Sequence, residues 1–168
     1  VTELTTDLWA MPVSRPYNPN AQRIAELIQA DWAAVGVTAN IVSYEWTEYR
    51  TRGKLEDRKG PFQIGWTGDN GDPDNFFATL FSCSAIGVSN YSSWCNEEFE
   101  AVIQEAKTTS DPAKRTELYK KAQEIFKADE PAMTLAHSRV FMPMSNKVQN
   151  YKMSPLGTHS FVGVDIAE

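Results

Sequence analysis

The densest run of side chains that could do chemistry spans residues 68–75 and reads Gly-Asp-Asn-Gly-Asp-Pro-Asp-Asn. A calcium loop would need oxygen ligands at its first, third and fifth positions and a glycine at its sixth. Counted from Asp69, the third residue is Gly71 and the sixth is Asp74, so the calcium pattern fails. A catalytic carboxylate pair, Asp69 with Asp72, stays open and would make the protein a peptide hydrolase. The sequence supplies neither a nucleophile nor the opposite wall of a cleft for it.

The three aspartates of this run have different local contexts. Asp72 directly precedes Pro73, a pattern typical of a helix N-cap followed by proline in the first turn. Asp74 then falls in that first turn, where the helix dipole favours a negative charge. Asp69 has no such structural role, and it follows the carboxyl end of a predicted strand, where α/β sheets bind ligands. The alternative, a turn-forming aspartate bonded to its own backbone, stays open.

Arg15 is a second candidate for binding. It lies in a turn that Pro16 and Pro19 stiffen, between an apolar segment at residues 8–13 and a predicted helix. A guanidinium held in a fixed turn suits bidentate recognition of a carboxylate. The alternative is an ordinary surface arginine.

The two cysteines, Cys83 and Cys95, flank a polar stretch that could fold back on itself. Their spacing fits no metal signature, and no base lies near either of them in the sequence, which disfavours a catalytic thiol. Two interpretations stay open at this point: a disulfide, which implies an oxidising compartment, or a pair of buried free thiols.

The elements that position these candidates follow from periodicity. Apolar residues recur at three- and four-residue steps from Ile24 to Val35 and predict a helix that Gly36 ends. Alternation in residues 37–44 predicts a strand, so the chain begins with a strand–helix–strand unit. The other predicted elements are helices at 45–55, 75–81, 99–106 and 112–129, the last with Asp111 as N-cap and Pro112 at N1, and strands at 61–66, 132–137, 140–144 and 162–166. This order predicts an α/β or mixed α+β class.

Composition and charge exclude several classes of protein. The net charge of −6 over 168 residues disfavours nucleic acid and anionic membranes as partners. No stretch approaches the ~20 apolar residues of a membrane span. The two histidines, His137 and His159, lie in no motif. The first residues lack Met and resemble no signal peptide, which suggests a processed chain or a fragment.

Three segments carry a family resemblance: residues 11–21 (Met-Pro-Val-Ser-Arg-Pro-Tyr-Asn-Pro-Asn-Ala), residues 29–32 (Gln-Ala-Asp-Trp) and above all residues 65–77 (Gly-Trp-Thr-Gly-Asp-Asn-Gly-Asp-Pro-Asp-Asn-Phe-Phe). They resemble the dipeptide-binding members of the family 5 solute-binding proteins of ABC importers, which also include oligopeptide- and nickel-binding proteins. Residues 89–95 and 155–157 fit the same members. The resemblance covers nearly the whole chain, which looks like the C-terminal third of such a protein.

The resemblance implies an α/β fold, with a mixed sheet flanked by helices, that forms part of one lobe of a two-lobed periplasmic binding protein of the class II type. Residues 1–138 would belong to the C-terminal ligand-binding lobe. Residues 139–168 would form a tail that returns to the N-terminal lobe. Because a fragment of this kind would lack the N-terminal lobe, the tail is expected to expose apolar surface, through which the fragment would associate with other chains; the full-length form would be a monomer.

The resemblance also implies a function. The protein would bind dipeptides in the periplasm and deliver them to the membrane permease subunits of an ABC importer, without enzymatic activity, cofactor or metal. Asp69 would pair with the ligand's α-ammonium and Arg15 with its α-carboxylate. The lining of the same pocket would comprise Pro16, Tyr17, Trp66, Thr67 and Gly68. The periplasmic location favours the Cys83–Cys95 disulfide.

Alternatives within the family are a carrier of longer peptides, of haem or of nickel. A haem carrier would want an axial ligand, for which His137 and His159 are the only histidines of the chain. Both are interpreted as structural.

Overall fold

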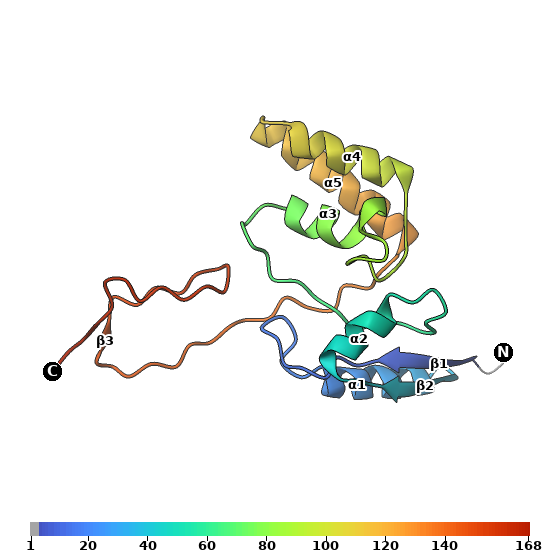
Figure 1. The fold of residues 1–168 in the computed structure, drawn as a ribbon, viewed down its shortest axis with the longest axis horizontal. Coiled ribbons are helices and arrows are strands. Elements are labelled where there is room, and N and C mark those ends of the chain that lie inside the picture. The colour runs from blue at the N-terminus through green and yellow to red at the C-terminus, as the bar shows by residue number, and fades with distance from the viewer. Residues whose placement is uncertain (1–3) are drawn as a thin grey trace.

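The computed structural model describes residues 4–168 and confirms the strand–helix–strand unit at the start of the chain (Figure 1). β1 (Leu4–Trp9) pairs in parallel with β2 (Val37–Val42), and α1 (Ala21–Ala33) crosses between them. The helix begins where Asn20 accepts the Arg23 N–H at 3.0 Å. The chain then reverses through Gly36, whose φ of +85° favours glycine.

The two faces of this parallel pair are buried differently. On one face, Leu8, Ala10 and Ala39 pack against Ala25 of α1. On the other face, Trp9 and Met11 form a cluster with the buried Tyr49 of α2 (Trp46–Gly53). The short helix at 45–55 is thus confirmed, and the Glu45 carboxylate caps it by accepting the Thr47 N–H at 2.8 Å.

The strand predicted at residues 61–66 is reduced to a single parallel bridge between Trp9 and Phe62. Trp9 donates its backbone N–H to the Pro61 carbonyl at 2.9 Å and accepts the Gln63 N–H at 3.1 Å. The buried Tyr49 hydroxyl bonds the Gln63 carbonyl at 2.7 Å, which holds the segment in place. Among the described residues no further strand pairs with the outer edge of this segment, so the prediction of a full strand was wrong.

The helical part of the chain forms a second layer (Figure 1). It comprises α3 (Asp74–Phe81), the 3₁₀ turn η1 (Cys83–Ala85), α4 (Glu97–Thr108) and α5 (Pro112–Asp129). The predicted start of α5 is confirmed, because the Asp111 carboxylate accepts the N–H groups of the first turn and Pro112 is the first helical residue. Phe99 and Ile103 of α4 form the fully buried centre of this layer with Ala122 of α5.

Arg58 and Phe62 join the two layers. The Arg58 guanidinium donates to the carbonyls of Gly53 and Gly60 and, at 2.7 Å, to that of Tyr91. The Phe62 ring stacks on the Tyr91 ring with centroids 4.6 Å apart. Burial of Arg58 lowers the pKa of its guanidinium, and the nearby Tyr49 opposes that shift. The layers are therefore linked by one cation and one aromatic stack.

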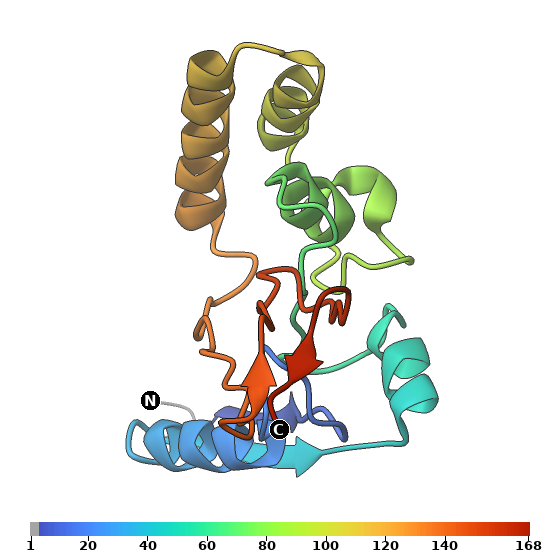
Figure 2. The ribbon, with the colours of Figure 1, turned by 90° about the vertical axis from the view of Figure 1, so that its left-hand side faces the viewer.

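Residues 131–168 first pass between the two layers and then extend away from them (Figure 1). They contain two short strands, β3 (Val148–Gln149) and β4 (Asp165–Ile166), which pair antiparallel (Figure 2). The strands predicted at 132–137 and 140–144 are absent, and the one at 162–166 keeps only its last two residues. These stretches have the composition of strands, but the described residues offer them no partner for their backbone groups.

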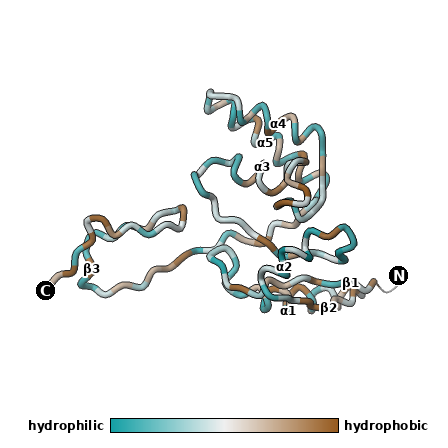
Figure 3. Tube along the Cα trace, viewed as in Figure 1, coloured by the Kyte–Doolittle hydropathy of each residue, from teal (hydrophilic) through white to brown (hydrophobic). Residues whose placement is uncertain are grey.

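This tail exposes apolar side chains, as expected. Figure 3 shows hydrophobic stretches along it, and Phe141 and Val162 are 81% and 93% exposed. It also contacts the body of the structure. The Ser138 hydroxyl donates to the Pro16 carbonyl, and Gly157 packs near Thr67, whose Cγ2 lies 3.6 Å from where a Cβ would stand on Gly157.

The Cys83–Cys95 disulfide is present and closes the polar loop between α3 and α4. Inside the loop, the buried Asn90 amide donates to the carbonyls of Ser82 and Trp94 at 3.1 and 2.9 Å. The loop is therefore ordered by its own hydrogen bonds as well as by the covalent link.

Removing this disulfide should destabilise the helical layer. Replacing both cysteines by serine is expected to lower the free energy of unfolding by about 3 kcal/mol, because the unfolded chain regains the entropy of the open loop. Urea unfolding with and without a reductant measures this, and the double variant, which the reductant cannot affect, is the control. Two free thiols in the denatured wild-type chain, or no response to the reductant, would contradict the assignment.

Candidate functional site

Three segments leave the parallel unit at the same edge. One follows β1 and carries Arg15, the second follows β2 and leads into Trp46, and the third follows the Phe62 bridge and carries Trp66 and Asp69. The carboxyl ends of parallel strands share one edge of a sheet, and ligands of α/β proteins bind there. The residues that the sequence predicts to bind the ligand thus lie on two neighbouring loops, the one after β1 and the one after the Phe62 bridge.

The Arg15 turn is closed by its own backbone. Arg15 and Asn18 exchange two N–H···O bonds of 3.0 Å, with Pro16 at the bend. The Arg15 guanidinium lies over the Trp46 ring, with its central carbon 5.0 Å from the ring centroid. Within residues 4–168 no carboxylate forms an ion pair with Arg15. The parallel N–H groups of its guanidinium are therefore available to bind an anionic group.

Tyr17 connects the two loops. A Cβ on Gly65 would lie 2.3 Å from Cδ2 of the Tyr17 ring, so the glycine lets the two segments meet. Burial raises the pKa of Tyr17, and the neighbouring Arg15 guanidinium opposes that rise. The phenol is therefore neutral at physiological pH, and its ring packs as an uncharged group between the two loops.

The loop that carries Asp69 is fixed by a residue that the sequence analysis missed. The Asn75 amide oxygen accepts the Trp66 indole N–H at 2.7 Å and the Asp69 backbone N–H at 3.0 Å. Its amide nitrogen donates to Asp69 Oδ2 at 3.1 Å. The expectation that Asp69 has no structural partner was therefore wrong, although its side chain is exposed and no described cation pairs with it.

Asp72 bonds the start of α3, as its context predicted. It precedes the N-cap position, however, where the sequence predicted that it would occupy it. Pro73 occupies the cap position of α3, and Asp72 Oδ1 accepts the Asp74 N–H at 2.9 Å. The Arg115 guanidinium of α5 lies 2.9 Å from Asp72 Oδ2. The bond from Asp74 and this guanidinium together hold the pKa of Asp72 below its usual range. A carboxylate kept ionised in this way is unsuited to act as a general acid.

A hollow of about 350 Å³ lies beside the Arg15 turn. The tail covers one side of it, with Ser138, Arg139 and Val140 facing Ser14, Arg15 and the prolines of the turn. Together with the Gly157–Thr67 contact, the tail thus reaches both predicted binding loops. The described residues give no direct contact between Arg15 and Asp69.

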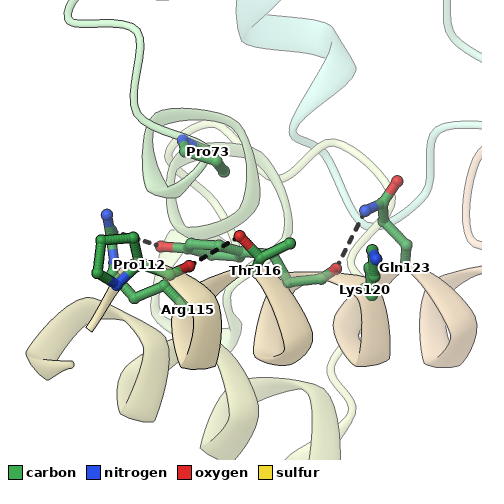
Figure 4. A pocket seen from close by; sticks show the side chains of 7 residues that line it. Pro73, Pro112, Arg115, Thr116, Lys120 and Gln123 are labelled. Carbon is green, nitrogen blue, oxygen red and sulfur yellow. Dashed lines mark hydrogen bonds between the residues drawn. The ribbon is translucent and has the colours of Figure 1, made fainter. Parts of the chain in front are cut away.

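A second hollow, of about 410 Å³, lies along α5 and the start of α3 (Figure 4). Its charged groups are Arg115 and Lys120. Arg115 is already bonded to Asp72 and, at 3.2 Å, to the Tyr119 hydroxyl. This hollow holds none of the residues singled out for binding, so the candidate site is the edge with the two loops.

Metal binding and membrane insertion find no support in the part of the chain that the structure describes. No group of three or more His, Cys, Asp or Glu side chains there could hold a metal ion. Over the same residues no helix combines the length and the apolar character that a membrane crossing requires.

Residues 4–88 match the bacterial extracellular solute-binding proteins, family 5, in their middle region. The dipeptide-binding protein of Escherichia coli (strain K12) is 58% identical over 161 residues, which cover 95% of this chain and 30% of that protein. Heme-binding protein A of Haemophilus influenzae is 47% identical over 161 residues, which cover 96% of this chain and 29% of that protein. A dipeptide-binding protein from Pseudoalteromonas sp. SM9913, solved in complex with Met-Leu, matches with a TM-score of 0.83 and 36% identity, covering 97% of this chain and 32% of that one. The chain thus spans about 30% of the length of the two sequence relatives.

The Asp72–Arg115 contact predicts a pH dependence of stability. A depressed pKa in the folded state adds stability that is present above the unfolded-state pKa and lost as the pH falls through the folded-state value. Asp72→Asn should lower the free energy of unfolding at neutral pH by up to about 1 kcal/mol, since the pair is partly exposed. The wild type should lose that advantage as the pH falls through the ordinary titration range of aspartate and below it, since the folded-state pKa is the lower of the two.

Urea unfolding at several pH values measures the effect. The matched control is Asp57→Asn, which changes a carboxylate in an exposed loop. Equal pH profiles for wild type and Asp72→Asn would contradict the role given to Asp72.

Proposed function

Because the chain belongs to the bacterial extracellular solute-binding proteins of family 5, we propose that it carries the ligand-binding edge of a dipeptide carrier that serves an ABC importer. The observation that carries the proposal is a free cation and a free anion on neighbouring loops of one sheet edge, Arg15 and Asp69. A dipeptide has one ammonium and one carboxylate at a nearly fixed separation. Two opposite anchors would therefore select ligands by length. The name of the Escherichia coli relative supports the same ligand class.

The two anchors differ in how they would bind. Arg15 would hold the ligand's carboxylate, because a guanidinium in a closed turn presents parallel N–H groups. Asp69 would hold the ammonium, since its exposed carboxylate has only a neutral partner. Pro16 and Tyr17 on one loop, and Trp66, Thr67 and Gly68 on the other, would line the space between them. Ligand side chains would be read loosely through water.

The missing part of the site would come from a second lobe. In this proposal residues 1–138 belong to one lobe, and residues 139–168 cross to the other. The exposed apolar residues of the tail and the small share of the relatives' length that the chain spans support this division. Closure of two lobes would shield the charged anchors from water. The disulfide fits an oxidising compartment such as the periplasm, where the carrier would meet the permease.

Rival functions find less support. A relative is named a haem-binding protein, but His137 is exposed in the irregular tail, and His159, also exposed, bonds the Tyr151 hydroxyl at 2.8 Å. A peptide hydrolase would use Asp69 with Asp72, but Asp72 is already engaged by Arg115. Neither rival accounts for an unpaired cation and an exposed anion on neighbouring loops.

Replacing an anchor should weaken binding strongly in a closed carrier. The test protein is the Escherichia coli relative with its matching segment replaced by this chain, so that both lobes are present. Asp69→Ala or Arg15→Ala should each cost about 2–5 kcal/mol in dipeptide affinity, because one buried charge of the ligand loses its partner. Calorimetric titration with a free dipeptide measures the loss.

Asp72→Ala is the matched control, since it removes a neighbouring carboxylate that serves the fold. It should lower stability by about 1 kcal/mol and leave affinity nearly unchanged. A dipeptide with an acetylated N-terminus should bind the wild type poorly yet lose little more on Asp69→Ala. If Asp72→Ala abolishes binding while Asp69→Ala does not, the two aspartates have been assigned the wrong way round.

A further inference from the structure

A single amide side chain, Asn75, ties three groups of the Asp69 loop together. We propose that Asn75 is a positioning residue, which sets the direction of the Asp69 carboxylate and the Trp66 indole toward the ligand. The inference rests on the proposed function, because it assigns Asn75 a role in the ammonium anchor of that site. It adds a residue that does not itself touch the ligand.

The three bonds determine how the Asn75 amide is turned. An indole N–H and a backbone N–H can only donate, so the amide oxygen must face Trp66 Nε1 and the Asp69 nitrogen, at 2.7 and 3.0 Å. The NH₂ group must then face Asp69 Oδ2, at 3.1 Å. One orientation of Asn75 satisfies all three contacts, and a flipped amide would satisfy none of them.

The Asn75 amide, which holds the Asp69 carboxylate, carries no charge, and this matters for binding. A lysine or arginine at position 75 would fix the Asp69 carboxylate but would also neutralise it. The Asn75 amide fixes one carboxylate oxygen and leaves the negative charge for an ammonium ligand. Among the described residues, Oδ1 of Asp69 has no hydrogen-bond partner. The arrangement therefore orients the anion without competing with the ligand for it.

The Asn75 side chain does not serve the helix on which it stands. It lies in the first turn of α3, but Asp72 is the side chain that bonds the first N–H of this helix, and all three Asn75 side-chain bonds go to the loop. The loop also packs closely here, since a Cβ on Gly68 would stand 2.9 Å from the Phe76 ring. Replacing Asn75 should therefore free the loop while the helix stays intact.

The test combines Asn75→Leu, which keeps a similar volume without the bonds, and Asn75→Ala, in case the leucine disturbs packing. In the grafted full-length protein, each should weaken dipeptide binding about tenfold. On an Asp69→Ala background the same change should cost less than about twofold, because the carboxylate that Asn75 orients is already gone. The indole N–H resonance of Trp66, assigned with Trp66→Phe, should shift in both Asn75 variants.

Asn96→Ala is the matched control. Asn96 caps α4 by accepting the Phe99 N–H at 2.9 Å, so this variant should lose stability without losing affinity or moving the Trp66 resonance. The inference is overturned if Asp69→Ala weakens binding but the Asn75 variants bind like wild type. It is also overturned if the Asn75 and Asp69 effects multiply independently. If Asp69→Ala itself binds like wild type, the proposed ammonium anchor fails, and the role of Asn75 fails with it.

Discussion

Trp9 donates its backbone N–H to the Pro61 carbonyl and accepts the Gln63 N–H, and these two bonds align the 61–66 segment parallel to β1. The whole site depends on this alignment. It directs the chain after β1 and the chain after Phe62 toward the same edge, so that the Arg15 turn and the Asp69 loop become neighbours. Gly65 then allows the loops to meet at the Tyr17 ring, which a side chain at that position would prevent.

Side chains from both layers help to keep this alignment. The Tyr49 hydroxyl secures the Gln63 carbonyl from α2, and its burial raises the pKa of Tyr49, so the phenol stays a neutral donor. Arg58 and the Phe62–Tyr91 stack attach the helical layer to the same segment. From that layer Asn75 reaches back to the Asp69 loop. A short extended segment with one ladder bridge is thus stabilised from both sides by side chains.

Much of this fold could be predicted from the sequence, because local signals were strong. The apolar stripe of α1, the turn at Gly36 and the Asp111-Pro112 start of α5 each depend on nearby residues alone. The tail strands could not be predicted correctly, since a strand exists only where a partner does, and the described chain offers none. Arg15 and Asp69 could be chosen by their turns. Asn75 could not, because its role depends on an amide six residues away in the chain folding back onto Asp69.

The central claim is that two opposite charges at one sheet edge recognise a ligand by the distance between its ends. Calorimetric titration of the grafted full-length protein with Ala-Ala, Ala-Ala-Ala and Ala-Ala-Ala-Ala, each with free termini, tests it most directly. The account predicts that the dipeptide binds best and that each added residue weakens binding, because the two ligand charges no longer reach both Asp69 and Arg15 at once. Equal affinity for all three peptides, or the tightest binding by the tetrapeptide, would contradict it.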